Sequence, residues 1–345
     1  MTPKERRRAI AENRPYDRIP HGFALGYAAS RVTGIKVSDF HRDAKKQVEA
    51  TVAAYRTYGL DGVGVRIDIE EVLGATFNYP DYREPYISAT LNLNEDALDT
   101  LTIDDPKKHP KLAIFWRVLD GLFEAVGDES YVSVSFRGPF SGSAALFGTE
   151  NFLRAVIRKP EFVHRAIEKV LEAELTFVEA LAGYGVGFSN SDPIASGTVI
   201  SPQQYRKFAK PYQTRLFDAE TRVSGRKPQY HVCGDTTRIL RDMVETGAGA
   251  VSVDNLMDLE LVADLVGSDA VVVGNVDPSG SMLLGTPDVV RQDLRNCLKK
   301  GSKAKGGYRA AFGCGLPIDT PPENLIALFD AFQEYGRYPF DPERL

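Results

Sequence analysis

Two residues of types that bind soft metal ions stand close together in this sequence. His231 and Cys233 lie two positions apart in the stretch PQYHVCGDTT, at the end of an apolar run. If the run is a strand, both side chains point to the same face. Gly234 then turns the chain, and Asp235 or Thr236 can cap a helix that follows. A cysteine at a helix start feels the positive end of the helix dipole, which favours its thiolate form.

A third candidate ligand comes from a distant part of the chain. Cys314 lies between Gly313 and Gly315 at the end of another apolar run. If both runs are strands of one barrel, their carboxyl ends open on the same mouth, and His231, Cys233 and Cys314 can converge. One imidazole and two thiolates suit zinc, and three protein ligands leave a fourth position open, as in catalytic zinc sites.

The charge of such a site favours alkyl transfer to sulfur. Zn²⁺ with two thiolates and a neutral imidazole is electrically neutral, so water bound there is a weaker nucleophile than water on a cationic zinc site. A substrate thiol bound there would lose its proton and become electron-rich. Alternatively, the zinc would act as a Lewis acid on the heteroatom of a methyl donor.

Each of these residues also has an ordinary structural explanation. A buried cysteine is usually a small apolar core residue, and this is our interpretation of Cys297 in VVRQDLRNCLKK. A lone histidine on a strand is commonly a hydrogen-bonded core residue. The His-x-Cys spacing together with a glycine-flanked cysteine favours the metal site.

Carboxylates at strand ends form a second group of candidates. Asp68, Asp192 and Asp254 each close or follow a predicted strand, where barrel enzymes carry their active-site residues. They could orient His231 through its second ring nitrogen, supply a fourth zinc ligand, or hold a substrate hydroxyl or ammonium group. Two have structural alternatives, because Asp192 precedes Pro193 in a common turn opening and Asp254 could cap a helix.

The rest of the sequence supplies elements that would position these residues. Apolar runs alternate with segments of helical periodicity, which predicts a parallel sheet closed into a (β/α)8 barrel. The predicted strands are residues 21–26, 62–68, 131–138, 186–192, 229–234, 250–255, 271–277 and 308–314. The predicted helices include residues 39–59 and helices that begin at Pro160, Ser201 and Thr320.

Three further features complete the expected architecture. The first strand lacks the glycine-rich phosphate turn of an open nucleotide-binding sheet. A long insertion, from about residue 72 to 111, separates the second strand from the next helix, and such insertions usually cover the mouth of a barrel. The Gly/Ser-rich stretch 136–148 is predicted to be a turn, which either lets a cofactor ring approach the backbone or is an ordinary loop. We expect one barrel domain over residues 1–345, with an N-terminal helical extension.

Composition excludes several classes of function. Of the 345 residues, 43% are hydrophobic and 26% charged, and the net charge of −5 argues against a nucleic-acid-binding surface. There is no apolar run of about 18 residues for a membrane helix, and the charged N-terminus lacks the apolar stretch of a secretory signal. Three cysteines do not form a disulfide framework. We therefore expect a cytoplasmic protein whose thiols stay reduced.

At QYHVCGDTTRIL and GCGLPIDTPPENLIALFDAF the sequence resembles the uroporphyrinogen decarboxylase superfamily, and within it the zinc-dependent methyltransferases linked to corrinoids. The likeness covers most of the chain, including GLDGVGVRIDIEEVLGATF, which holds the family's strand-two aspartate, here Asp68. It implies a (β/α)8 barrel with its cleft at the carboxyl ends of the strands. The methyltransferases carry His-x-Cys and a later Cys as zinc ligands, and His231, Cys233 and Cys314 match these positions.

The same resemblance separates two activities. Uroporphyrinogen decarboxylases use no metal and carry an arginine-rich segment after the first strand, where this chain has only Arg31 in HGFALGYAASRVTG. They also have a histidine near the last strand, where this chain has FGCGLP. Metal-free decarboxylation of a tetrapyrrole stays as the alternative, and a structural or redox-sensing zinc in a binding protein is a second one.

The resemblance implies methyl transfer between a small molecule and a protein-bound cobalamin, in its methylcobalamin and cob(I)alamin forms. The branch includes methylcobalamin:coenzyme M enzymes, which methylate a thiol. It also includes enzymes that take methyl from a small donor, such as an aromatic methyl ether in O-demethylation, and load it onto a corrinoid protein. This chain has no Asp-x-His-x-x-Gly motif for a cobalt-ligating histidine, so the corrinoid would arrive on a separate partner protein.

Overall fold

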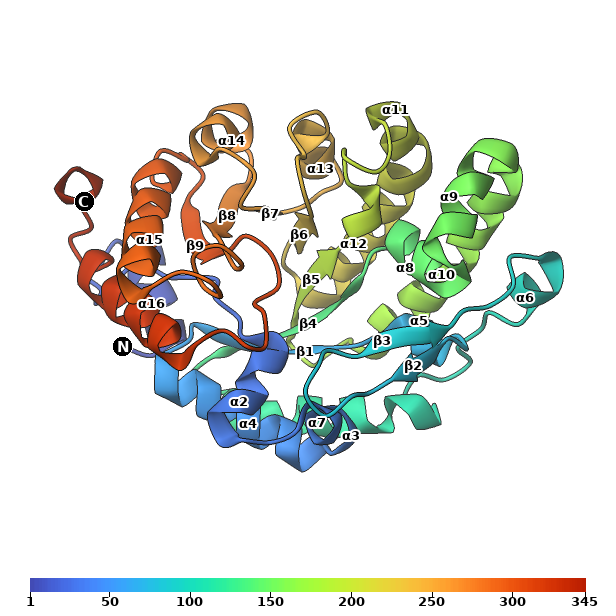
Figure 1. The fold of residues 1–345 in the computed structure, drawn as a ribbon, viewed down its shortest axis with the longest axis horizontal. Coiled ribbons are helices and arrows are strands. Elements are labelled where there is room, and N and C mark those ends of the chain that lie inside the picture. The colour runs from blue at the N-terminus through green and yellow to red at the C-terminus, as the bar shows by residue number, and fades with distance from the viewer.

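In the computed structural model, which describes residues 1–345, parallel strands form one curled sheet with helices around its outer face (Figure 1). The sheet has seven strands in the order β1-β4-β5-β6-β7-β8-β9. They are β1 (Gly62–Arg66), β4 (Tyr131–Arg137), β5 (Gly187–Ser191), β6 (Gln229–Val232), β7 (Ala250–Val253), β8 (Val271–Val276) and β9 (Tyr308–Phe312). These strands confirm the barrel-type α/β fold and all the predicted strands but the first.

The helices are α1 (Pro3–Ala11), α2 (Ala29–Thr33), α3 (Val37–Arg42), α4 (Ala44–Tyr58), α5 (Ile69–Val72), α6 (Glu95–Asp99), α7 (Ala113–Val126), α8 (Pro139–Phe147), α9 (Thr149–Arg158), α10 (Pro160–Ala180), α11 (Pro202–Gln204), α12 (Lys210–Ser224), α13 (Leu240–Glu245), α14 (Leu259–Val266), α15 (Pro287–Gly301) and α16 (Pro322–Tyr335). Helices α4, α7, α12, α13, α14 and α15 pack against the strands of this sheet, and others, such as α2, α3, α6 and α9, pack on neighbouring helices. No helix has both the length and the apolar composition needed to cross a lipid bilayer.

The predicted N-terminal helix and the insertion are both present. Helix α1 begins with a capping box in which Thr2 and Glu5 each accept a backbone N–H of the other. The insertion between β1 and α7 holds a separate antiparallel pair, β2 (Thr76–Asn78) and β3 (Tyr86–Ala89), followed by α6. Figure 1 shows this pair as a small ribbon beside the main sheet.

The prediction of a strand at residues 21–26 is wrong. This segment runs beside β9, where the N–H of Gly22 donates to the carbonyl of Ala310 at 2.8 Å, but it forms no ladder with β1. The reason is a side chain that takes the place of a backbone partner. The N–H of His21 donates to the carboxylate of Asp61 at 2.7 Å, just before β1 begins.

Asp61 therefore connects the start of β1 to the segment at residues 21–26, at the gap where a further strand would close the sheet. Its buried carboxylate also accepts hydrogen bonds from Arg18 at 2.8 Å and from Arg6. Burial would raise the pKa of this carboxyl, but the positively charged groups packed around it hold the pKa below its usual value. The amino-terminal end of the barrel is thus joined by an ion-pair cluster.

The inner face of the sheet is hollow on one side. On β1, β4, β5 and β6, buried residues that face the helices alternate with partly exposed residues that face the interior. Many of the interior residues in the middle of β1, β4 and β5 are small, and they include Gly64, Ser133, Ser135, Ser189 and Ser191. On the opposite side, Ala250 of β7, Val273 of β8 and Ala311 of β9 pack against one another and fill the interior.

Two helical predictions need correction. Residues 39–59 form two helices, because the side chain of Asp43 accepts the N–H groups of Lys45 and Lys46 and starts α4 anew. Residues 136–148 are mainly helix α8 instead of a turn. A side chain in place of Gly142 would meet the buried carboxylate of Glu174 at 3.3 Å, so glycine lets this helix pack closely.

The other predicted helix starts are correct or differ by two residues. Helix α10 begins at Pro160 as expected, and Ser201 caps α11 through a capping box with Gln204. The last helix begins at Pro322, two residues after the predicted Thr320.

Replacing Asp61 with Asn should lower the free energy of unfolding by about 3 to 5 kcal/mol, because Arg6 and Arg18 would stay buried without a counter-charge. Urea denaturation followed by circular dichroism measures this change. The control is Asp81→Asn, which removes an exposed pair with Lys36 and should cost about 1 kcal/mol or less. Equal losses for the two variants would refute the role of Asp61 at the gap in the sheet.

Candidate metal centre

His231, Cys233 and Cys314 converge at the carboxyl ends of β6 and β9, as the sequence predicts. Their ligand atoms all lie within 4.8 Å of one another. Nε2 of His231 is 3.3 Å from Sγ of Cys233, which is 3.6 Å from Sγ of Cys314. The two cysteines are 81 positions apart in the chain, so only the barrel brings them together.

The conformation around Cys233 follows from the local sequence. Tyr230 and Val232 are buried against the helices, which turns His231 toward the barrel interior. Gly234 has a φ of +75°, and a side chain there would meet Ser196 Oγ at 3.0 Å. Glycine is therefore required at the turn that aims the thiol of Cys233.

Ser252 orients the imidazole, and the sequence reasoning missed it. Nδ1 of His231 lies 3.2 Å from both the carbonyl oxygen and the hydroxyl of Ser252. The two residues are direct partners in the parallel register of β6 and β7. A proton on Nδ1 donated to Ser252 leaves the lone pair of Nε2 free for a metal ion. The sequence did hold a signal for Ser252, because it stands two residues before the candidate Asp254 and therefore faces the same side of the strand.

The two thiols suit a divalent cation. Hydrogen bonds from Cys233 and from His231 lower the pKa of the Cys314 thiol to about 4. The same contact with Cys314, together with burial, raises the pKa of Cys233. Two thiolates 3.6 Å apart repel each other, and a divalent cation among the three ligands would neutralise both. The donor set of one imidazole and two sulfurs fits zinc.

Asp68 lies at the mouth of the barrel, beside two arginines. One carboxylate oxygen accepts from Arg66 at 3.1 Å and from Arg137 at 2.9 Å. Burial would raise the pKa of Asp68, but the charges of Arg66 and Arg137 hold it below its usual value. The group is therefore an ionised carboxylate with fixed cationic partners.

Asp192 and Asp254 are held by other protein groups. Asp192 is fully buried and accepts from the N–H of Ser141 at 2.8 Å and from the hydroxyl of Tyr230 at 3.2 Å. Burial raises its pKa to about 6. Asp254 accepts the N–H of Gly234 at 2.9 Å and so fixes the turn after Cys233.

None of the three carboxylates belongs to the group of ligand atoms within 4.8 Å of one another. The orienting contact to His231 comes from Ser252 and not from a carboxylate.

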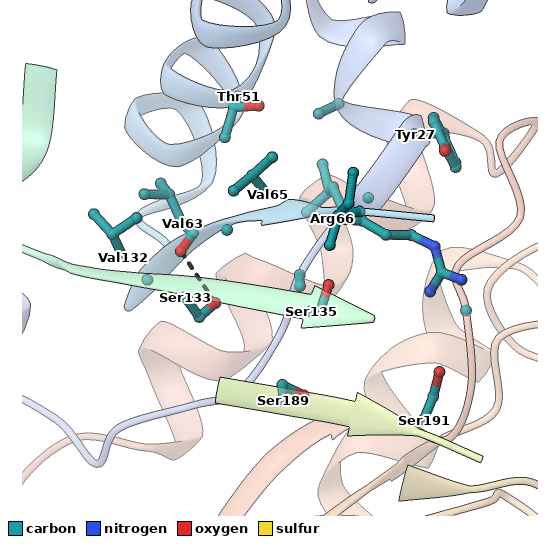
Figure 2. Close-up of a pocket in the computed structure, with 18 of the residues that line it drawn as sticks. Tyr27, Thr51, Val63, Val65, Arg66, Val132, Ser133, Ser135, Ser189 and Ser191 are labelled. Atoms are coloured by element: carbon teal, nitrogen blue, oxygen red, sulfur yellow. Dashed lines mark hydrogen bonds between the residues drawn. The ribbon is translucent and has the colours of Figure 1, made fainter. Parts of the chain in front are cut away.

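A cavity of about 1210 Å³ adjoins this centre, and Cys314 and Asp68 both line it. Its lining takes in serines on the inner face of β4 and β5 and also residues on the helix-facing side of β1, such as Val65 and, on α4, Thr51. Figure 2 shows its serine wall, with Ser133 and Ser135 on one strand and Ser189 and Ser191 on the next. The metal centre therefore opens onto a space large enough for a small organic molecule.

Comparisons with known proteins identify the family of the chain. Residues 2–335 match the family model described as Uroporphyrinogen decarboxylase (URO-D). The methylcobamide:CoM methyltransferase MtbA of Methanosarcina acetivorans is 26% identical over 342 residues, which are 97% of this chain and 98% of that protein. The uroporphyrinogen decarboxylase of Crocosphaera subtropica is 25% identical over 296 residues, 83% of this chain and 81% of that protein.

A solved methyltransferase from Methanosarcina mazei has the same fold. Its TM-score to this chain is 0.80 at 22% sequence identity, over 97% of this chain and 99% of that one.

Replacing Ser252 with Ala should weaken zinc binding by about tenfold, because His231 would keep the carbonyl contact but lose the hydroxyl. Competition with a chromophoric chelator measures the affinity. The control is Ser189→Ala, a serine of the cavity wall that does not contact the three ligands. Unchanged zinc affinity in Ser252→Ala would show that the hydroxyl does not support His231.

Proposed function

The chain belongs to the uroporphyrinogen decarboxylase family, and within this family we propose that it is a zinc-dependent methyltransferase. The methyl group would move between a small molecule and the cobalamin of a separate corrinoid protein. The small molecule would be a methyl donor, such as an aromatic methyl ether, or a thiol acceptor. The convergence of His231, Cys233 and Cys314 beside a cavity is the observation that carries this proposal.

Sequence identity does not separate the two activities found among the relatives. A methyltransferase and a decarboxylase match the chain at 26% and 25% identity. The ligand cluster favours the methyltransferase, because removal of a carboxyl group from a porphyrinogen has no use for two cysteines and a histidine at one point. Activation of a sulfur or oxygen atom for methyl transfer does use such a cluster.

Each residue of the centre has a defined task in this reaction. When bound, zinc would act as a Lewis acid on the heteroatom that gains or loses the methyl group. His231, Cys233 and Cys314 would hold it, and Ser252 keeps the imidazole in the orientation that offers Nε2. Asp254 positions the turn that carries Cys233.

The mouth supplies charge for orienting the small molecule. Arg66 and Arg137 converge on Asp68, and Arg137 also contacts Glu70 at 3.0 Å. These side chains stay fixed by their mutual contacts, so a polar group that enters the mouth meets preorganised donors and acceptors. The walls of the barrel exclude bulk water from the part of the molecule that lies in the cavity.

The rim of the mouth has apolar side chains that a protein partner can cover. Leu256 follows β7 and is 71% exposed, and Leu284 follows β8 and is 79% exposed. Val199, in the loop after β5, is 45% exposed. Cobalamin has to approach the metal centre from this side, so we assign these loops to the contact with the corrinoid protein.

Replacing Cys314 with Ala should abolish retention of zinc and lower methyl transfer by at least about 100-fold, because Lewis-acid assistance is worth several kcal/mol. The assay follows the absorbance of cobalamin on a corrinoid protein during incubation with a panel of methylated compounds and thiols. Cys297→Ala, which removes a buried cysteine outside the cluster, should keep both properties.

Two results would overturn the proposal. Metal-free protein that decarboxylates a porphyrinogen would establish the decarboxylase. A Cys314→Ala variant with a lower melting temperature but intact methyl transfer would establish a structural role for the metal.

Replacing Leu256 and Leu284 together with Asp should raise the KM for the corrinoid protein by about tenfold or more, because both side chains would lose apolar contact with the partner. Steady-state assays with varied corrinoid protein measure this change, and zinc content should not change. The control is Ile157→Asp on α9, which is 76% exposed and lies outside these loops. An unchanged KM would show that the partner docks elsewhere.

A further inference from the structure

The cavity extends from the mouth of the barrel to its floor. At the mouth it is lined by Cys314 and Arg137, which stand at the carboxyl ends of β9 and β4. At the floor it is lined by Tyr131, Gln229 and Arg309, which stand at the amino ends of β4, β6 and β9. Barrels of this type normally fill this space with layers of bulky side chains. Here glycine and serine on β1, β4 and β5 leave it open.

Arg309 points into this space. It lies two residues before Ala311, whose side chain packs inside the barrel against Val273 and Ala250. Side chains two residues apart on a strand share a face, so the guanidinium of Arg309 also faces the interior. Arg309 is the second residue of β9 and therefore lies near the amino end of this strand.

The cations at the floor lack carboxylate partners. The guanidinium groups of Arg309 and Arg7 form no hydrogen bond or salt bridge within the chain. Arg7 lies over the ring of Tyr131, 4.3 Å from its centroid. Asp61 is the acidic residue that lines this end, and Arg6, Arg18 and His21 already occupy its oxygens.

The two arginines also repel each other. Burial lowers the pKa of Arg309 to about 10, and the charge of Arg7 contributes to this shift. Arg309 stays charged at neutral pH, and the charge of Arg7 lowers its pKa more than the charge of Asp61 raises it, so positive charge at the floor is only partly offset. An anion placed between them would remove this repulsion.

We propose that the floor of the barrel, at Arg309 and Arg7, binds the carboxylate tail of an elongated substrate whose methyl-accepting or methyl-donating atom lies at the metal centre. This proposal rests on the proposed function and adds the class of substrate. Arg309 and Cys314 are separated by roughly 10 Å of strand, from Arg309 to Phe312, and by the turn that holds Gly313 and Cys314. An aromatic ring with a methoxy group at one end and a carboxylate at the other has the elongated shape that contacts with both groups require.

The walls between the two ends fit such a molecule. The hydroxyl groups of Ser133, Ser135, Ser189 and Ser191 line one side. They can donate to or accept from ring substituents. A planar carboxylate matches the fork of a guanidinium, which makes Arg309 a better partner for it than a lysine would be.

The test compares ligands matched at the methyl end and different at the tail. Isothermal titration calorimetry measures the binding of 4-methoxybenzoate, 4-methoxycinnamate and neutral methoxybenzene to the zinc-loaded protein. We expect at least one of the two carboxylates to bind about tenfold or more tightly than methoxybenzene, as for a charge-assisted hydrogen bond. Arg309→Gln should remove this difference, and Arg309→Lys should restore part of it.

Two further variants control the experiment. Arg165→Gln removes an exposed arginine paired with Glu95 on the surface and should keep the preference for the carboxylate. Ser189→Leu fills the cavity and should weaken binding of the carboxylates by about tenfold or more while zinc stays bound.

The inference is wrong if neither carboxylate binds more tightly than methoxybenzene, or if Arg309→Gln keeps the preference. These outcomes do not depend on methyl transfer. If the protein transfers methyl from a short neutral donor and Arg309→Gln does not change this activity, the carboxylate site at Arg309 is contradicted and the proposed function stands. A carboxylate preference lost in Arg309→Gln, in a protein without methyl transfer to cobalamin, would uphold the site and overturn the function.

Discussion

Two cysteine sulfur atoms 3.6 Å apart, carried by β6 and β9, set the geometric requirement that the rest of the fold meets. Unshielded thiolates at this distance repel, so the arrangement is stable with a shared proton or a cation. It also requires that two strands separated by β7 and β8 keep a fixed distance. The continuous parallel ladder from β6 to β9 and the packed interior at Ala250, Val273 and Ala311 provide this rigidity.

The two halves of the barrel therefore have different tasks. The filled half, β7 to β9, holds the residues that position the ligand atoms, including Ser252 and Asp254. In the hollow half, β1 to β6, the inner side chains do not pack into a core, and a cavity reaches the floor of the barrel. At β1 the buried carboxylate of Asp61 joins the neighbouring segments in place of a backbone ladder.

The fold and the three candidate ligand residues can be predicted from the sequence because both depend on local patterns. Strand alternation and helix periodicity identify seven strands and several of the helices, and the His-x-Cys spacing with a glycine-flanked cysteine identifies the three converging residues. The errors have non-local causes. The strand expected at residues 21–26 loses its partner because Asp61 takes the N–H of His21. Helix α8 looked like a turn because its Gly and Ser content reflects close packing against buried side chains such as Glu174.

Other features required the register of the sheet. Ser252 is recognised as the partner of His231 only when β6 and β7 are aligned. The cavity is recognised only when the small residues of β4 and β5 are known to face an interior that the opposite strands do not fill. From the sequence alone, these serines cannot be distinguished from the polar positions of any half-buried strand.

The two ends of the cavity differ in whether their arginines have carboxylate partners. At the mouth, Arg66 and Arg137 are neutralised by Asp68 and Glu70, so an entering anion finds cations that already have partners. At the floor, Arg7 and Arg309 have none. An anionic molecule gains most by moving its charged end inward, since electrostatic attraction is strongest where water is excluded. Its uncharged methyl-bearing end is then left at the thiols, on the side of the barrel that a partner protein can reach.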